Sequence, residues 1–365
     1  MKNSKHIAIF VPSFLGGGVE KMMVYLANNF VGKNYTVDYI VINNSGPYKK
    51  LLSSQVNIVD LRKKRILNTI FPLTKYLNNN KPDALLTAMN YVNIIAIVSC
   101  ILSYNKINII ISERAITSLN IIQSRYSFLM KILIKLFYKY PKKIVAISTD
   151  VKTDLENNFN VKSKKIKVIY NMVNINKINK VIPDESIRKQ LGIKTTNNLL
   201  IAIGRLDKYK NFQYLISSLV HLKNLNNTHL ILLGDGEEKE SLVNQINLLN
   251  LNKNVSLLGF VDNPESYLKV SNLFISTSTQ EGFGNVIIEA MAAGVPVVVT
   301  NCLGGPREIL CNGKFGELVP LNKPQILAKA IEKSLSRKKH PDIKKRSKDF
   351  SINIISQQYL NFLFQ

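Results

Sequence analysis

Short apolar segments alternate with longer amphipathic segments along the whole chain. The apolar segments are rich in Val, Ile and Leu, which predicts buried β-strands. The predicted strands are residues 7–12, 36–42, 84–88, 107–112, 143–147, 167–170, 199–204, 229–234, 255–258, 273–276 and 295–300. Amphipathic helices are predicted between them, for example at residues 20–30, 212–222 and 238–249. Strand–helix alternation at this spacing predicts parallel sheets with helices on both faces, an α/β class.

The chain of 365 residues is long for one core and comfortable for two. A polar stretch rich in Asn and Lys at residues 171–183 separates the two series of strands. The sequence therefore predicts one doubly wound domain over residues 1–175 and a second over 176–349. Residues 350–365 are predicted to form a terminal helix.

Composition is that of a folded protein, with 46% hydrophobic and 20% charged residues. Cys100, Cys302 and Cys311 form no CxxC pair and are too few for a disulfide framework, which favours a reducing cytoplasm. The apolar start at residues 7–11 lacks a cleavage site and is predicted to be a strand. The run at residues 92–103 is shorter than the roughly 20 residues of a spanning helix.

The net charge of +25 is unevenly distributed. Residues 1–180 hold 27 Lys+Arg and 8 Asp+Glu, whereas the remainder holds 22 and 16. This asymmetry predicts an anionic partner for the first half: nucleic acid, an acidic membrane surface or a phosphorylated acceptor. No stacking platform, zinc spacing or helix-turn-helix pattern accompanies the charge, so nucleic acid is not expected.

The most informative segment is EGFGNVIIEAMAAGVP at residues 281–296. A helix is predicted to begin near Asn285 and to end at Gly294, because Pro296 cannot continue it. The N–H groups and dipole of the helix start favour a phosphate or diphosphate. Glu289, further along the helix, can reach another part of the same ligand, such as ribose hydroxyls.

In each predicted domain, the loop after the first strand is also informative. SFLGGGVEK at residues 13–21 carries three of the five glycines in the first 180 residues, and Glu20 replaces the last glycine of an NAD fingerprint. GRLDKYKNF at residues 204–212 places Arg205 and Lys210 so that both can converge on one diphosphate. Fixed cations there would stabilise negative charge that develops on a bound diphosphate.

Together these segments resemble the signatures of glycosyltransferase family 4, whose members are retaining enzymes of the GT-B fold that use nucleotide-sugars. The resemblance covers about residues 5–320 and implies two facing Rossmann-like domains with a cleft between them. It also implies that the C-terminal helix packs back on the first domain. The implied catalytic residues are Glu281, Arg205 and Lys210. The implied donor-binding residues are Gly17, Gly18, Gly204, Arg205, Lys210, Gly259, Phe260, Phe283, Gly284, Asn285 and Glu289.

The acceptor side is assigned to Gly16, Glu20 and the strand-end sequence Ser112-Glu113-Arg114. No histidine lies between His6 and His221, and no Asp-x-Asp occurs, so neither a histidine base in the first domain nor a divalent metal is expected. The family's usual proposal, in which the leaving phosphate takes the acceptor proton, fits a domain so poor in bases. No cofactor is expected, because the nucleotide-sugar is a co-substrate.

Residues 124–143 are predicted to form a basic amphipathic helix, with lysines at 131, 135 and 139. Such helices lie on anionic membranes, and the basic cluster at residues 62–65 favours the same surface. The predicted function is retaining transfer of a hexose or N-acetylhexosamine from a nucleotide-sugar, expected to be a UDP-sugar, to a lipid-diphosphate-linked glycan in surface polysaccharide synthesis. The enzyme would be cytoplasmic and peripheral at the inner face of the membrane. A nucleotide-sugar hydrolase or epimerase and a non-catalytic binder of anionic polymers remain alternatives.

Overall fold

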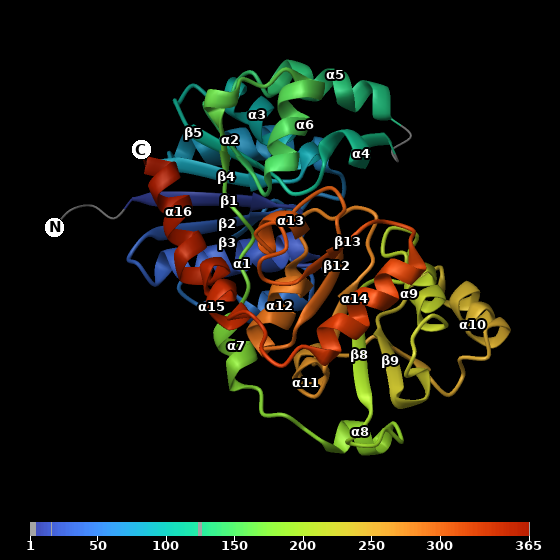
Figure 1. Cartoon of the computed structure of the whole chain (residues 1–365). Coiled ribbons are helices and arrows are strands. Elements are labelled where there is room, and N and C mark those ends of the chain that lie inside the picture. Colours follow the sequence, from blue (N-terminus) through green and yellow to red (C-terminus); the bar gives the residue numbers. More distant parts are fainter. Residues whose placement is uncertain (1–4, 16, 123–125, 365) are drawn as a thin grey trace. The chain divides into compact units, whose positions relative to one another are not determined.

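The computed structural model describes residues 5–15, 17–122 and 126–364 (Figure 1). The chain forms two compact units, each with its own parallel sheet. Unit 1 comprises Met1–Met172 with Ile352–Gln365, and unit 2 comprises Val173–Ser351. The chain thus changes units within three residues of the boundaries expected at 175/176 and 349/350.

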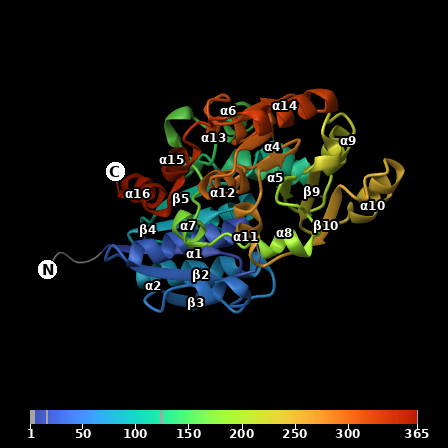
Figure 2. The same cartoon turned by 60° about the horizontal axis from the view of Figure 1, so that its bottom comes forward.

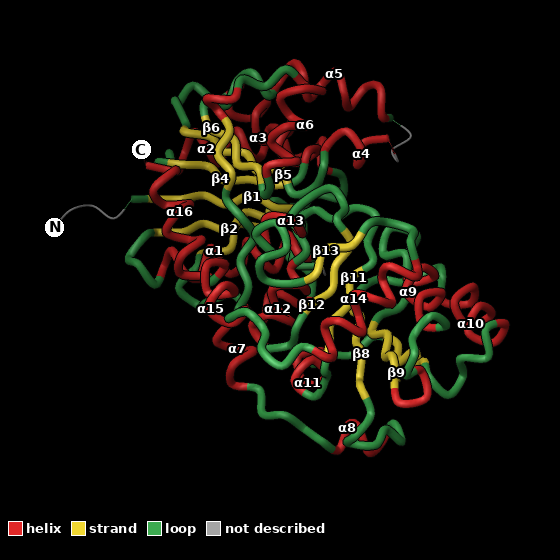
Figure 3. Tube along the Cα trace, in the orientation of Figure 1, coloured by secondary structure: helices red, strands yellow, loops and turns green. Residues whose placement is uncertain are grey.

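Unit 1 contains a seven-stranded sheet in the order β3-β2-β1-β4-β5-β6-β7, with every pair parallel (Figure 3). Its strands are β1 (His6–Val11), β2 (Thr36–Val41), β3 (Asn57–Asp60), β4 (Ala84–Ala88), β5 (Asn108–Glu113), β6 (Lys143–Ala146) and β7 (Ile166–Val168). Its helices are α1 (Gly18–Val31), α2 (Ile70–Asn80), α3 (Asn90–Leu102), α4 (Thr117–Ile122), α5 (Ser127–Phe137), α6 (Thr149–Phe159) and α16 (Ile352–Phe364).

The C-terminal helix α16 belongs to the core of unit 1, where it packs beside α1 (Figures 1 and 2). Buried Ile355, Tyr359 and Leu360 join the cluster formed by β1 and α1. Polar contacts fix its register, since Lys33 donates to Gln357 at 2.6 Å and Lys143 donates to the carbonyl of Phe362 at 2.7 Å. The last helix therefore completes the core of the unit that the first residues begin.

Unit 2 contains a six-stranded parallel sheet in the order β10-β9-β8-β11-β12-β13. Its strands are β8 (Asn198–Ile203), β9 (Thr228–Leu233), β10 (Val255–Gly259), β11 (Leu273–Ser276), β12 (Val297–Thr300) and β13 (Glu317–Val319). Its helices are α7 (Ile175–Lys180), α8 (Ser186–Gln190), α9 (Phe212–Leu219), α10 (Lys239–Leu248), α11 (Pro264–Lys269), α12 (Asn285–Ala293), α13 (Pro306–Ile309), α14 (Pro324–Ser336) and α15 (Ile343–Ser347). Two doubly wound parallel sheets confirm the predicted fold class.

The structure tests two predicted helices and contains two strands that were not predicted. The helix predicted at Asn285–Gly294 is α12, which ends where Gly294 adopts a left-handed φ of 87°. The helix predicted at 124–143 is shorter, because α5 ends at Phe137 and Lys143 begins β6; residues 124 and 125 lie outside the described residues. Strands β3 and β13 were not predicted, because edge strands of three or four residues with polar positions lack an apolar run.

Within the residues described, no helix combines the length and apolarity needed to cross a bilayer.

Candidate active site

The order of strands in unit 2 defines where a ligand can bind. Strands β8 and β11 are neighbours, but the chain leaves β8 toward β9 on one side and leaves β11 toward β12 on the other. The two loops that follow, residues 204–211 and 277–284, therefore diverge from the carboxyl edge of the sheet. Such a topological switch point is where open α/β sheets bind their ligands. Both loops carry residues that the sequence singled out.

Lys210 and Glu281 meet at this switch point although 71 residues separate them. The Lys210 Nζ atom lies 2.5 Å from Oε1 of Glu281, and the hydroxyl of Ser278 donates to the same oxygen at 2.7 Å. Both side chains are mostly buried, with 24% and 13% of their surfaces exposed. The site thus contains a cation whose position is fixed by a carboxylate from the opposite loop.

Arg205 lies on the same loop as Lys210 but is far more exposed. Its Nε donates to Oδ2 of Asp207 at 2.7 Å, and 74% of the side chain is accessible to solvent. Asp207 is buried, and its Oδ1 accepts the N–H groups of Tyr209 and Lys210 at 3.0 Å each. The loop therefore presents one enclosed and one exposed cation.

Close backbone packing holds the loop in place. A Cβ at Gly234, where φ is 135°, would overlap the carbonyl of Gly204. A Cβ at Gly204 would lie 2.9 Å from Cε of Lys210, so the absence of a side chain lets the lysine fold over the backbone. The hydroxyl of Thr277 donates to the carbonyl of Lys210 at 2.9 Å. The Thr277 hydrogen bond therefore joins the two loops in addition to the ion pair.

Helix α12 begins beside Glu281. Gly284 caps the helix with a φ of 101°, a conformation that favours glycine. The Oδ1 atom of Asn285, the first helical residue, is buried without a hydrogen-bond partner among the described residues. Glu289 lies one turn further and is half-buried. Phe283 is enclosed against the ring of Phe350, so only its backbone can face a ligand.

Gly259 is the last residue of strand β10, two strands away from the switch point, and Phe260 follows it. Gly259 has a φ of 72°, and its carbonyl accepts the N–H of Gly234 at 2.7 Å. The side chain of Phe260 is 79% exposed. A large exposed aromatic ring beside the Gly234 turn is suited to stacking on a planar ligand group.

The switch point of unit 1 lies between β1 and β4. Gly17 caps α1, Gly18 is its first residue, and Gly16 lies outside the described residues. Glu20 lies in the first turn of α1, where burial raises the pKa of its carboxyl above the ordinary value. Tyr91 follows β4, and its phenol pKa is raised by burial and by the charge of Glu20. Tyr91 has no signal in the sequence, because it is one tyrosine in an apolar helix.

Ser112, Glu113 and Arg114 are all buried at the end of β5. Glu113 accepts hydrogen bonds from Asn93, Tyr138 and Thr117. Burial, opposed by these bonds, raises the pKa of its carboxyl to about 7.

Arg114 donates to the hydroxyl of Tyr359 at 2.7 Å and to Asn171 at 2.8 Å, which ties β5 to α16. The contacts of these side chains lie inside unit 1, so they support its loops from beneath. Their assignment to the acceptor side remains a prediction.

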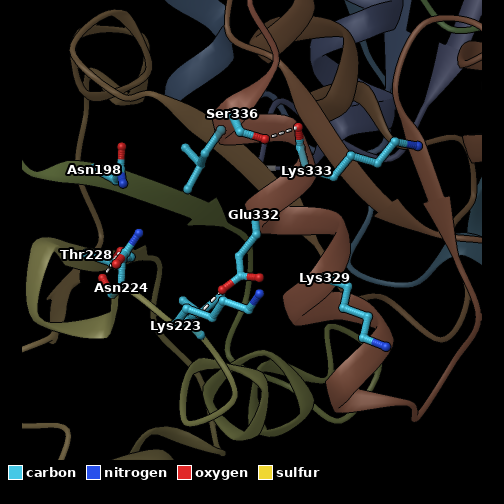
Figure 4. A pocket seen from close by; sticks show the side chains of 10 residues that line it. Asn198, Lys223, Asn224, Thr228, Lys329, Glu332, Lys333 and Ser336 are labelled. Carbon is cyan, nitrogen blue, oxygen red and sulfur yellow. Dashed lines mark hydrogen bonds between the residues drawn. The ribbon is translucent and has the colours of Figure 1, made fainter.

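A separate pocket of about 480 Å³ lies at the opposite edge of the unit 2 sheet (Figure 4). Asn198 and Thr228, which begin β8 and β9, line it together with residues of α14. The side chain of Glu332 reaches across to accept the backbone N–H of Lys223 at 2.6 Å. Because parallel strands begin at this edge, the pocket is remote from the loops that carry Lys210 and Glu281.

Asp207 and Ser278 are the residues of the site that the sequence analysis missed. Asp207 lies between Arg205 and Lys210 in the motif, where an acidic residue is expected to be a solvated loop residue. Ser278 stood three residues before Glu281 in a polar stretch. Only the folded structure shows that Asp207 organises the two cations of its loop. It also shows that Ser278 holds the carboxylate of Glu281.

Two family models match the two halves of the chain. The family model described as glycosyl transferases group 1 matches residues 183–351, and the model described as glycosyltransferase family 4 matches residues 16–177. The chain is 32% identical over 335 residues to an uncharacterized glycosyltransferase of Methanocaldococcus jannaschii, covering 81% of this chain and 82% of that protein. The chain belongs to glycosyltransferase family 4.

Two further similarities extend over nearly the whole chain. The chain is 28% identical to the N-acetylgalactosamine-N,N'-diacetylbacillosaminyl-diphospho-undecaprenol 4-alpha-N-acetylgalactosaminyltransferase of Campylobacter jejuni, over 98% of this chain and 99% of that protein. The crystal structure of Anabaena HepE in complex with UDP is similar in fold, with a TM-score of 0.81, 22% identity and coverage of 98% and 99%. The protein is therefore a transferase enzyme of the GT-B fold.

Proposed function

We propose that this glycosyltransferase moves a hexose or N-acetylhexosamine from a UDP-sugar to a lipid-diphosphate-linked glycan, with retention, in surface polysaccharide synthesis. The observation that carries the proposal is the Lys210–Glu281 pair at the unit 2 switch point with Arg205 exposed beside it. The full-length similarity to a transferase whose name specifies a diphospho-undecaprenol acceptor and a 4-alpha product supports the acceptor class. An α product from an α-linked nucleotide-sugar retains the anomeric configuration.

The chemistry follows from the charges of the site. The bond between the anomeric carbon and the β-phosphate oxygen breaks, and its electron pair stays on the leaving nucleoside diphosphate. Arg205, Lys210 and the start of α12 stabilise that charge more in the transition state than in the ground state. The acceptor oxygen bonds to the same face of the sugar, and its proton passes to the departing phosphate oxygen. We propose that these cations perform the role without a metal ion, so activity should survive a chelator.

The acceptor brings the enzyme to a membrane, and α5 has the surface for it. Leu129, Ile132 and Leu136 lie at helical spacing and are about half exposed, while Ile134 on the other side is buried. Lys131 and Lys135 lie on one side of this apolar stripe. An exposed apolar stripe beside lysines is the pattern of a helix that lies on an anionic bilayer, at the inner face of the membrane. The high positive charge of residues 1–180 favours the same partner.

Turnover tests the proposal directly. The full-length protein is incubated with a panel of UDP-sugars and with undecaprenyl-diphosphate-linked acceptor glycans of one to three sugars. Sugar transfer with an α linkage is expected for one donor. Release of free sugar at the same rate with and without acceptor would contradict transfer and would favour the hydrolase alternative.

Vesicle flotation tests the membrane partner separately. We expect binding to vesicles that contain anionic lipid, a weaker signal with neutral vesicles, and loss of binding in a K131E/K135E variant. Lys239→Glu with Lys253→Glu in unit 2 makes the same charge change and should bind normally. Equal binding of both double variants would contradict the α5 assignment.

A further inference from the structure

Asp207 has contacts that go beyond those of an ordinary loop acid. Its side chain is only 9% exposed although its loop neighbour Arg205 is largely accessible to solvent. Both carboxylate oxygens are used, and each faces a different group. A buried carboxylate must be compensated by hydrogen bonds or charge, so its position has been fixed by the groups that surround it.

The two oxygens act on different parts of the site. Oδ1 accepts the N–H of Tyr209 and the N–H of Lys210, each at 3.0 Å, which closes the loop before α9. Closing the loop fixes the backbone from which Lys210 reaches Glu281 at 2.5 Å. This oxygen therefore sets the position of the enclosed cation.

Oδ2 accepts Nε of Arg205 at 2.7 Å. The two terminal nitrogens of that guanidinium make no hydrogen bond or ion pair within the described part of the chain. An arginine held at Nε presents its terminal nitrogens as a fixed pair, which is the arrangement that binds two phosphate oxygens at once. The second oxygen therefore orients the exposed cation.

We propose that Asp207 is a positioning residue for the donor: it couples Arg205 to Lys210, so that both cations are arranged for a diphosphate before the nucleotide-sugar binds. The inference rests on the proposed function, because the ligand is the nucleoside diphosphate of the donor. Preorganisation removes the loss of side-chain freedom that binding would otherwise incur. Both of its oxygens are already used by Arg205 and by the loop backbone, so Asp207 acts through these groups.

Two substitutions separate its two effects. Asp207→Asn keeps an oxygen for the N–H groups of Tyr209 and Lys210 but turns an N–H toward Arg205. We expect its dissociation constant for UDP, measured by calorimetry, to rise about tenfold at an unchanged melting temperature. Asp207→Ala loses both effects, so we expect weaker UDP binding still and a lower melting temperature.

A double variant tests whether Asp207 acts through Arg205. If it does, D207N should weaken UDP binding little further once Arg205→Ala is present, because the partner of Oδ2 is gone. Asp342→Ala is the matched control, since Asp342 also accepts a backbone N–H, that of Lys345 at 2.9 Å. It should lower the melting temperature and leave UDP binding unchanged.

The outcomes are distinguishable. D207N binding UDP as tightly as wild type, or weakening it equally in the R205A background, would overturn the inference and leave the proposed function intact. Failure of the wild-type protein to bind UDP would contradict the proposed function and the inference together. Weakening of UDP binding by D342A would show that loss of stability alone explains the effect.

Discussion

The Lys210–Glu281 pair makes opposite predictions for its two members. If Glu281 serves as the counter-charge of Lys210, replacing it by Gln leaves a lysine whose full charge is available to a diphosphate. Replacing Lys210 by Ala removes that charge. We therefore expect E281Q to bind UDP more tightly than wild type while its turnover falls, and K210A to bind UDP more weakly.

The magnitude follows from the distances. The Nζ atom lies 2.5 Å from Glu281, and a phosphate oxygen bound on its open side would lie about 5–6 Å from that carboxylate. Two unit charges at that separation repel by about 1.5–3 kcal/mol when the effective dielectric constant is about 20–40. Removing the carboxylate charge should therefore tighten UDP binding about tenfold or more. Loss of Lys210 should weaken it by a similar factor.

Calorimetric titration with UDP at two salt concentrations measures both effects. The gain in E281Q should shrink at high salt, because it is electrostatic. Glu317→Gln is the matched control, since Glu317 pairs with Lys333 at 2.9 Å at the start of β13. Weaker UDP binding by E281Q than by wild type would refute the counter-charge role and show that the carboxylate itself holds the nucleotide.

Two further predictions concern stability and packing. Burial raises the pKa of Glu113 from 4.5 to about 7. Between these pH values the folded protein keeps a proton on Glu113 that the unfolded chain has released. The free energy of unfolding should therefore fall as pH rises through this range. The loss of unfolding free energy is on the order of 3 kcal/mol. The E113Q variant should abolish this pH dependence in melting curves measured from pH 5 to 8. If the slope of stability against pH is unchanged in E113Q, other groups cause it. Gly204→Ala should push Lys210 away from Glu281, because the added Cβ would lie 2.9 Å from Cε. Its UDP affinity should fall with little change in melting temperature, and unaltered affinity would show that the lysine repacks freely.

The sequence specified much of the fold because its signals are local. The apolar runs identify nearly every central strand, and Gly294 with Pro296 marks the end of α12 correctly. The edge strands β3 and β13 have no such signal, because they are only four and three residues long and carry polar residues such as Asn57 and Glu317. Local pattern thus predicts buried elements better than exposed ones.

The site was predictable only in part, because a sequence pattern carries local signals and no tertiary contacts. The motifs named Arg205, Lys210 and Glu281, yet the pairing of the last two depends on the neighbouring positions of β8 and β11, which a sequence pattern does not encode. The burial of Glu113 likewise depends on Asn93 and Tyr138, which come from distant helical segments. Partners brought together by tertiary structure are what the sequence could not supply.

We propose that Arg205, Lys210 and the start of α12 hold the diphosphate of the donor. A crystal structure of the protein with UDP tests it most directly. We predict phosphate oxygens within hydrogen-bond distance of the terminal nitrogens of Arg205 and of Nζ of Lys210, with the ribose toward Glu289. UDP bound elsewhere, for example in the pocket lined by Asn198 and Lys329, with these side chains unchanged, would contradict the claim.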